Sequence, residues 1–435
     1  MAPASDFIII RCGTLLDGAG GTHKNAAITV AAGRITHVAS WDETPRPAGA
    51  RIVDAGGLTV LPGLFDCHDH LASPGHHLAD KAATPPSLYV LRVAEAMREM
   101  LQAGFTTVRD MGGLDLGLKM AVDQGLLAGP RVLISLAIIT QTAGLSDAVN
   151  AVGFHTDVLR LPGTPDGVCD GVDGVRQMTR RLIRAGADFI KIATTGGISS
   201  RISNILTREF TFDEVKAVVD EARAFSRPVA AHAYGGEGLK NALRAGVHSV
   251  EHLGPLDDDD IATMVRQGTY LVPTLSNMSV RLEMAKQPGA LSPYNIQKAQ
   301  ELAPLQWDVF ARAYRAGVRI AAGTDSRPLR QGGNARELSL LVQYGMTPMD
   351  AIRAATSVAA GCCNLPDTGR VEVGTRADLI AVDGDQLHDI EILDESDRIA
   401  LVMRDGVVFK EKARLSPDRA MTTSGRTVGA WPQTS

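Results

Sequence analysis

Four histidines, one lysine and one aspartate each lie at or just after a short apolar run, where a buried strand would deliver them to a shared site. Neutral imidazole is the commonest ligand of catalytic zinc, and a carboxylate can both bind a metal ion and accept a proton. Together these groups could hold two metal ions and hydrolyse a bond. The residues are His68, His70, Lys191, His232, His252 and Asp325.

His68 and His70 flank Asp69 after an apolar segment. Because side chains two residues apart in a strand point to the same face, both imidazoles can reach one metal ion. Asp69 would point the other way, so we expect it to have a structural role. His232 and His252 end two further strand-like runs, one strand–helix–strand step apart, which predicts that they lie side by side.

Lys191 and Asp325 complete the set. An amine at the inner end of a strand is costly unless it is paired or modified. Reaction with CO₂ would turn Lys191 into a carbamate, an anionic ligand that can bridge two metal ions about 3.5–4 Å apart. A lysine held in a salt bridge is the alternative. Asp325 would accept a proton from the attacking water and pass it to the leaving nitrogen.

From residue 61 onward, strand-like runs alternate with helical patterns, which predicts an α/β fold of the (β/α)₈ TIM-barrel type. Active sites of this fold lie at the carboxyl ends of the strands, where the candidate ligands stand. Thr211 and Glu214 have the spacing of a capping box that opens one helix. The expected strands cover 62–67, 105–109, 131–136, 188–193, 228–232, 248–252, 270–274 and 318–323.

Both ends of the chain carry short strand-like segments outside the predicted barrel of residues 61–364. We expect residues 1–60 and 365–415 to pair into one small composite β-domain, a β-sandwich. The tail, 416–435, is rich in Ser, Thr and Arg and is expected to be poorly ordered.

Composition narrows the class of protein. The formal net charge of −5 on 435 residues, with scattered Lys and Arg, argues against a nucleic-acid or membrane-surface partner and favours a small-molecule substrate. The five cysteines form no paired framework, which favours a reduced, cytoplasmic setting. The sequence shows no signal-peptide pattern and no apolar stretch of the roughly 20 residues that span a bilayer. It also has no GxSxG nucleophile elbow and no P-loop.

Several motifs resemble those of the amidohydrolase superfamily of metal-dependent hydrolases. They are the segments 61–71 (LPGLFDCHDHL), 189–197 (FIKIATTGG), 231–235 (AHAYG), 250–254 (VEHLG) and 323–326 (GTDS), followed by 346–356 and 374–382. The sequences of these motifs most resemble those of the prolidase-like dipeptidases and N-acyl-amino-acid hydrolases, whose relatives cleave ochratoxin-type amides, phenylureas and thiocarbamates.

The resemblance implies a role for each candidate. His68, His70 and Asp325 would hold the more buried metal ion, carboxylated Lys191 would bridge, and His232 with His252 would hold the second ion. Zinc is the expected metal, with manganese, cobalt or iron as alternatives. A metal-bridged hydroxide would attack the carbonyl, with Asp325 as the proton shuttle. Tyr234 would be a catalytic and substrate-binding residue that contacts the substrate's carboxylate, or else a packed aromatic at the rim. Relatives often form homo-oligomers, so self-association is also expected.

Leu145 and Gln331 lie in loops that should line the pocket and bind the substrate, and peptide-cleaving relatives carry histidine at both positions. The loss of two imidazoles weakens the case for an ordinary dipeptide. Arg201, Arg327 or Arg330 could take over carboxylate binding through a bidentate contact. The leading hypothesis from the resemblance is hydrolysis of the amide of an N-acyl amino acid or dipeptide, including ochratoxin-type amides. The alternative is a substrate without a carboxylate, such as an N-aryl carbamate, a phenylurea or an anilide. A remote alternative is a metal-free, non-catalytic scaffold.

Overall fold

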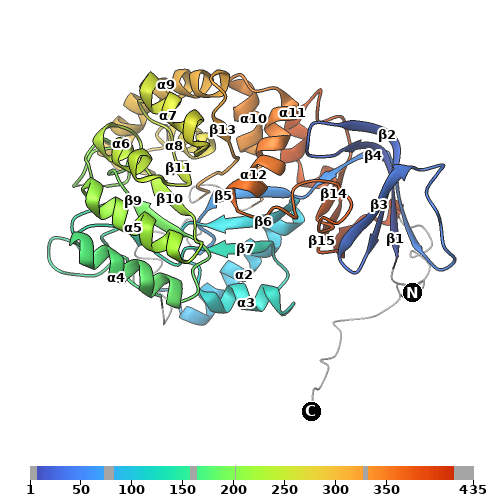
Figure 1. Ribbon diagram of the computed structural model, residues 1–435, viewed down its shortest axis with the longest axis horizontal. Coiled ribbons are helices and arrows are strands. Elements are labelled where there is room, and N and C mark those ends of the chain that lie inside the picture. Colours follow the sequence, from blue (N-terminus) through green and yellow to red (C-terminus); the bar gives the residue numbers. More distant parts are fainter. Residues whose placement is uncertain (1–6, 73–82, 157–163, 201, 327–331, 416–435) are drawn as a thin grey trace, which may run out of the picture.

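The computed structural model describes residues 7–72, 83–156, 164–200, 202–326 and 332–415. Within these ranges the fold is α/β. The strands that carry the candidate site form two parallel sheets, and helices cover them on the outside (Figure 1). No helix in the described ranges is both long and apolar enough to cross a membrane.

The parallel strands follow one another in chain order. One sheet has the order β5-β6-β7 and the other β13-β12-β11-β10-β9-β8. Backbone hydrogen bonds connect the two sheets, from Cys67 N to Ala322 O (2.9 Å) and from Asp188 N to Ile134 O (2.8 Å). This arrangement fits a TIM-barrel type. The strands are β5 (Leu64–Asp69), β6 (Phe105–Asp110), β7 (Arg131–Ile134), β8 (Ile138–Ile139), β9 (Ile190–Ala193), β10 (Val229–His232), β11 (Ser249–Glu251), β12 (Tyr270–Val272) and β13 (Arg319–Ile320).

Each of the eight strands expected from the sequence has a counterpart, although most are shorter than expected. The two-residue strand β8 was not expected, because it directly follows β7 without an intervening helix. The described parallel strands form two separate hydrogen-bonded sheets, so closure into a continuous eight-stranded barrel stays a prediction.

Helices separate most of the strands and turn their apolar faces inward. The predicted capping box at Thr211 is confirmed: its side chain accepts from Glu214 N, and the Glu214 side chain returns to the backbone of Thr211. The helices are α2 (Pro86–Gln102), α3 (Leu116–Asp123), α4 (Gly171–Arg184), α5 (Phe212–Ala224), α6 (Gly236–Ala245), α7 (Asp258–Gln267), α8 (Leu275–Met284), α9 (Pro293–Arg315), α10 (Arg336–Gln343), α11 (Pro348–Ala354) and α12 (Ser357–Cys362).

Strands from both ends of the chain lie side by side at one end of the molecule (Figure 1). Their hydrogen bonds join them into one seven-stranded sheet, whereas we expected a sandwich of two sheets. The order is β16-β15-β14-β4-β1-β2-β3. The strands are β1 (Ile8–Leu16), β2 (Thr22–Ala31), β3 (Arg34–Ser40), β4 (Arg51–Pro62), β14 (Leu379–Val382), β15 (Ile399–Arg404) and β16 (Val407–Glu411).

The long strand β4 connects this sheet to the rest of the molecule. It pairs with β1 and with β14, and the chain then runs almost directly into β5. Arg131 at the start of β7 adds charged contacts, with Nη1 2.6 Å from Asp378 Oδ2 and Nη2 2.6 Å from Asp405 Oδ1. The domain limits at residues 60 and 365 stay a prediction, and the tail 416–435 lies outside the described residues.

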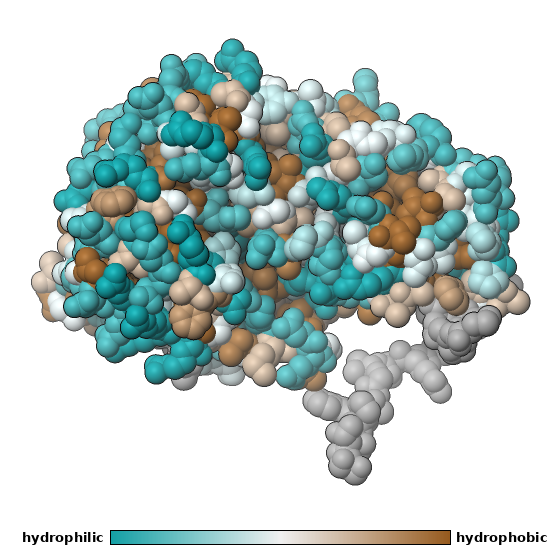
Figure 2. All heavy atoms as spheres, in the orientation of Figure 1, coloured by the Kyte–Doolittle hydropathy of each residue, from teal (hydrophilic) through white to brown (hydrophobic). Residues whose placement is uncertain are grey.

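The face of the molecule in Figure 2 is mainly hydrophilic, with hydrophobic residues in separate small patches. Exposed apolar side chains such as Leu91, Val152 and Ile202 lie far apart in the sequence. A homo-oligomer therefore stays a prediction.

Candidate active site

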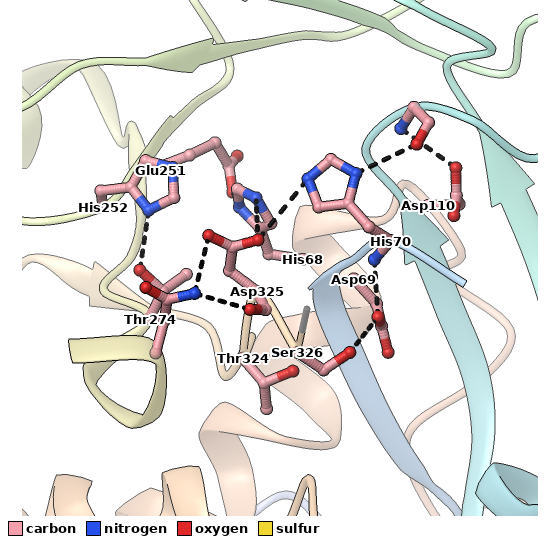
Figure 3. A network of polar contacts seen from close by, with 12 residues as sticks. His68, Asp69, His70, Asp110, Glu251, His252, Thr274, Thr324, Asp325 and Ser326 are labelled. Atoms are coloured by element: carbon pink, nitrogen blue, oxygen red, sulfur yellow. Dashed lines mark hydrogen bonds and ion pairs between the residues drawn. The ribbon is translucent and has the colours of Figure 1, made fainter. Parts of the chain in front are cut away.

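His68, His70 and Asp325 converge although they come from opposite ends of the catalytic region. His68 and His70 come from β5 and the residue after it, and Asp325 follows β13. Asp325 Oδ1 lies 4.0 Å from His68 Nε2 and 3.6 Å from His70 Nε2 (Figure 3). One ligand atom from each residue lies within 4.8 Å of the others, so the three form a group that could hold a metal ion.

Strand register brings Lys191 and His232 to the same place. Lys191 on β9 pairs with Ala230 on β10, two residues before His232, so the alternation of the strands directs both side chains to one face. His252 follows β11, and its ring centroid lies 4.4 Å from that of His232 and 4.8 Å from that of His68. All six predicted ligands line one pocket of about 90 Å³.

Each imidazole uses one ring nitrogen for a fixed hydrogen bond. His68 Nδ1 meets Glu251 Oε2 (2.9 Å), His70 Nδ1 meets Gly112 O (3.0 Å), His252 Nδ1 meets Thr274 Oγ1 (2.8 Å) and His232 Nε2 meets Gly196 O (3.2 Å). Such bonds orient ligating histidines and set their tautomer, which leaves the other nitrogen of each ring for a metal ion.

The electrostatics suit cation binding. Burial, followed by the charge of Lys191, lowers the pKa of His68 and lowers the pKa of His232 well below the ordinary value. Burial also lowers the pKa of His252 well below the ordinary value, and the other histidines reinforce the effect. The rings are therefore neutral near pH 7, the form that binds metal. Asp325 Oδ1 is buried and accepts no hydrogen bond from the described residues, so the group fits a metal ion.

A buried ion pair behind His68 was not found from the sequence. Arg109 on β6 places Nη2 2.7 Å from Glu251 Oε1, and its Nε donates to Cys67 O (2.6 Å). Burial opposes the ionisation of Glu251, but Arg109 and the other cations outweigh it and lower the pKa of Glu251 to about 2. The carboxylate therefore stays ionised and holds the proton on His68 Nδ1.

Asp69 makes structural contacts, as expected from its position between His68 and His70, where side chains alternate between the two faces of the strand. Its Oδ1 accepts from His70 N (2.6 Å) and from the Ser326 hydroxyl, and its Oδ2 accepts from Asn334 Nδ2 (3.2 Å). Asn334 also donates to Asp66 Oδ2 (2.7 Å). Burial, with the nearby charge of Asp69, raises the pKa of Asp66 well above its ordinary value. These bonds fix β5 to the segment that carries Asp325.

The left-handed backbone conformation occurs at two of the strand ends, with φ of +73° at His252 and +49° at Asp325. This conformation costs roughly 1–3 kcal/mol for a residue other than glycine. At His252 it interrupts the alternation of the strand, so that the adjacent residues Glu251 and His252 both contact His68.

The predicted substrate-binding residues divide into two groups. Tyr234 and Leu145 line the pocket, and the ring of Tyr234 stacks on His252 at a centroid distance of 5.2 Å. Arg201, Arg327, Arg330 and Gln331 lie outside the described residues.

Helix α8 contributes pocket residues that sequence reasoning missed. It begins directly after Thr274, the hydrogen-bond partner of His252. Asn277 donates from Nδ2 to Asp325 O (2.8 Å) and Oδ2 (3.1 Å), and Arg281 lines the pocket. Thr274, Asn277 and Arg281 have the three- and four-residue spacing of one helix face, a signal that the sequence did offer.

Comparisons with known proteins place this geometry in a family. The sequence profile of the amidohydrolase family matches residues 59–409. The chain belongs to the amidohydrolase family. This amidohydrolase is 34% identical over 418 residues to ochratoxinase from Aspergillus niger, an alignment that covers 92% of this chain and 86% of that protein.

Solved structures agree with the family. A Xaa-Pro dipeptidase with bound methionine in the active site superposes with a TM-score of 0.85 at 32% identity, covering 93% of this amidohydrolase and 100% of that chain. A. niger ochratoxinase superposes with a TM-score of 0.84 at 32% identity, covering 94% and 96%. Phenylurea hydrolase B, at 23% identity and a TM-score of 0.74 over 98% of this chain and all of that one, shows the shared fold alone. The family resemblance seen in the motifs is thus confirmed, and the protein is a hydrolase of amide-type C–N bonds.

Proposed function

We propose that this amidohydrolase is a metal-dependent amidase that cleaves an N-acyl amino acid or a dipeptide, ochratoxin-type amides included. One observation carries the proposal. Four imidazoles, a buried lysine and a carboxylate oxygen that accepts no hydrogen bond from the described residues meet in one pocket, at the ends of parallel strands.

Two divalent metal ions fit the donor set. His68, His70 and Asp325 would hold one, His232 and His252 the other, and the carbamate of Lys191 would bridge them. Imidazole and carboxylate suit zinc best, and also manganese, cobalt and iron. When bound, such ions lower the pKa of water and polarise a carbonyl oxygen.

Asp325 is the residue that moves the proton. Asn277 holds its backbone carbonyl and Oδ2, so Oδ1 stays directed toward the histidines. In the reaction, water oxygen bonds to the carbonyl carbon, Asp325 accepts the water's proton, and the C–N bond then breaks. Asp325 returns the proton to the leaving nitrogen, which departs as an amine.

The choice of an amino-acid amide is supported by the relatives and by the pocket. Ochratoxinase and a dipeptidase with bound methionine in its active site are both about one-third identical to this chain. In the pocket, Tyr234 stands beside the metal ligands with Arg281 on the same wall.

A second candidate is a neutral N-aryl carbamate, urea or anilide. Leu145 occupies a position where peptide-cleaving relatives carry histidine, and together with Ile138 and Ile198 it gives the pocket an apolar wall. An apolar wall favours an aryl group on the substrate whichever bond is cleaved.

The test compares an N-aroyl-L-phenylalanine with an N-aryl carbamate of similar size, using enzyme supplied with divalent metal and bicarbonate. We expect the amide to be hydrolysed with at least 100-fold higher kcat/KM, and Asp325→Asn to lose about 10³-fold in kcat, within the range for general acid–base catalysis. Preference for the carbamate would establish the second candidate. Protein that gains no metal and hydrolyses neither compound would be a scaffold.

A further inference from the structure

Arg281 is a cationic side chain in the pocket that the metal chemistry does not use. Among the described residues that line the pocket, the only lysine is Lys191 and the only arginine is Arg281, and Lys191 lies among the metal ligands. Arg281 is half-buried on α8 and lines the same pocket as Tyr234.

Neutral groups fix the orientation of the Arg281 guanidinium. Its Nε donates to Asn277 Oδ1 (2.6 Å), and its Nη2 donates to Ser199 Oγ (3.2 Å). No carboxylate of the described residues forms an ion pair with it, although other arginines of the chain have such partners, as Arg336 has Glu283. No described residue accepts a hydrogen bond from Nη1, so within the described ranges this edge of the guanidinium can take a ligand.

Tyr234 supplies a second donor on this wall. Its ring packs with Ile198 and Met278, and its side chain lines the pocket that Arg281 also lines. A phenol O–H is a hydrogen-bond donor. A guanidinium edge and a phenol on one wall match the oxygens of a carboxylate.

We propose that Arg281 binds the carboxylate of the substrate's amino-acid part, with Tyr234 as second donor and Asn277 as the positioning residue that links this contact to Asp325. The inference rests on the proposed function and identifies the carboxylate as the substrate group that the pocket recognises. The loop arginines expected from the sequence lie outside the described residues and stay a prediction.

Asn277 gives the carboxylate contact a consequence for catalysis. Its Oδ1 accepts from Arg281 and its Nδ2 donates to Asp325, so a single amide holds both side chains. A substrate carboxylate on Arg281 therefore places the adjacent leaving nitrogen on the side of the pocket where Asp325 delivers its proton. Substrates with a carboxylate next to the scissile bond gain binding and alignment together.

The experiment uses N-benzoyl-L-phenylalanine and N-benzoylphenethylamine, which differ only in the carboxylate. We expect the metal-loaded wild type to prefer the acid at least 100-fold in kcat/KM. Arg281→Gln should lower this preference at least 30-fold, mainly through a higher KM for the acid, and Arg281→Lys should restore part of it. Asn277→Ala should lower kcat on both compounds. Arg336→Gln, which removes an arginine that contacts α8 away from the pocket, is the matched control and should keep the wild-type preference.

An equal loss on both compounds in Arg281→Gln would overturn the inference, because Arg281 would then be only structural. A wild type that cleaves both compounds equally would also overturn it, while leaving amide hydrolysis in place. If neither compound is cleaved, the proposed function fails, and binding decides the inference alone. In that case calorimetric titration should show L-phenylalanine binding at least tenfold more tightly to wild type than to Arg281→Gln, and equal affinity would overturn the assignment.

Discussion

Glu251 on the metal side of the pocket is held differently from Glu209 and Glu337 on the substrate side. On the metal side, Glu251 faces Arg109 and His68, and its pKa is lowered to about 2. On the substrate side, Glu209 accepts from Leu145 N (2.6 Å) and Thr140 Oγ1 (3.0 Å), and Glu337 accepts from Leu275 N (3.0 Å) and Ser276 N (2.7 Å). Burial raises the pKa of both to about 7.

The pKa values differ because the carboxylates have different hydrogen-bonding partners, since all three side chains are buried. A neutral donor repays only part of the cost of burying a charge, whereas a guanidinium outweighs it. Glu251 therefore keeps its charge at any ordinary pH. The substrate side, with the Leu145 loop and the first turn of α8, is held by groups that titrate near neutrality.

The largest expected effect is on the metal side. Glu251→Gln should cost about 3–5 kcal/mol of unfolding free energy, because it leaves the buried Arg109 unpaired. It should also lower metal affinity or activity about 10–100-fold through the loosened His68 ring. Denaturant unfolding and metal analysis would measure the two effects.

Glu237→Gln is the control for that variant. Glu237 pairs with Arg208 at the surface, with 68% of its side chain exposed, so its loss should change the unfolding free energy by less than about 0.5 kcal/mol. If Glu251→Gln and Glu237→Gln changed the unfolding free energy equally, the buried ion pair would be no more important for stability than the surface ion pair.

A smaller effect, with a defined pH dependence, is expected on the substrate side. Because the folded-state pKa of Glu337 is raised from 4.5 to about 7, the folded protein binds this proton more tightly than the unfolded chain. Its contribution to stability is full below pH 4.5 and is lost as the pH rises toward 7. Glu337→Gln removes this titration and should gain up to about 3 kcal/mol relative to wild type between pH 4.5 and 8, at 1.36 kcal/mol per pKa unit.

Unfolding free energies of wild type and Glu337→Gln across that pH range would measure the change. A difference between the two proteins that stays constant with pH would show that Glu337 is ionised in the folded state, as Glu251 is.

The smallest expected effect on stability comes from a residue that lines neither side of the pocket. Thr211→Ala removes the side-chain cap of α5 and should cost about 1 kcal/mol of unfolding free energy, with kcat and KM unchanged. Thermal unfolding and a standard assay suffice. A change in kcat would mean that α5 communicates with the pocket, which its contacts do not indicate.

The sequence indicated the metal side better than the substrate side, for physical reasons. His68, His70, His232 and Asp325 could be found because a strand end and a period of two fix where a side chain points. Glu251 could not, because strand alternation assigns it and His252 to opposite faces. Only the left-handed conformation of His252 brings both to His68.

Arg281 was missed for a different reason. It lies one helical turn beyond Asn277 on a helix that follows a strand, and a helix has many polar residues that face solvent. Its place in the pocket depends on how α8 is oriented, which is set by contacts distant in sequence, such as the bonds from Leu275 N and Ser276 N to Glu337.

The seven-stranded sheet has a consequence for how the protein is made. Strand β4 pairs with β14 through partners such as Pro62 and Leu379, more than three hundred residues apart. At about 5–20 residues per second, β4 waits on the order of 15 to 60 s on the ribosome for that partner. During this time the edge of β4 that β14 will cover is open to pairing with other chains. The nascent chain thus depends on shielding of its first strands until its last ones emerge.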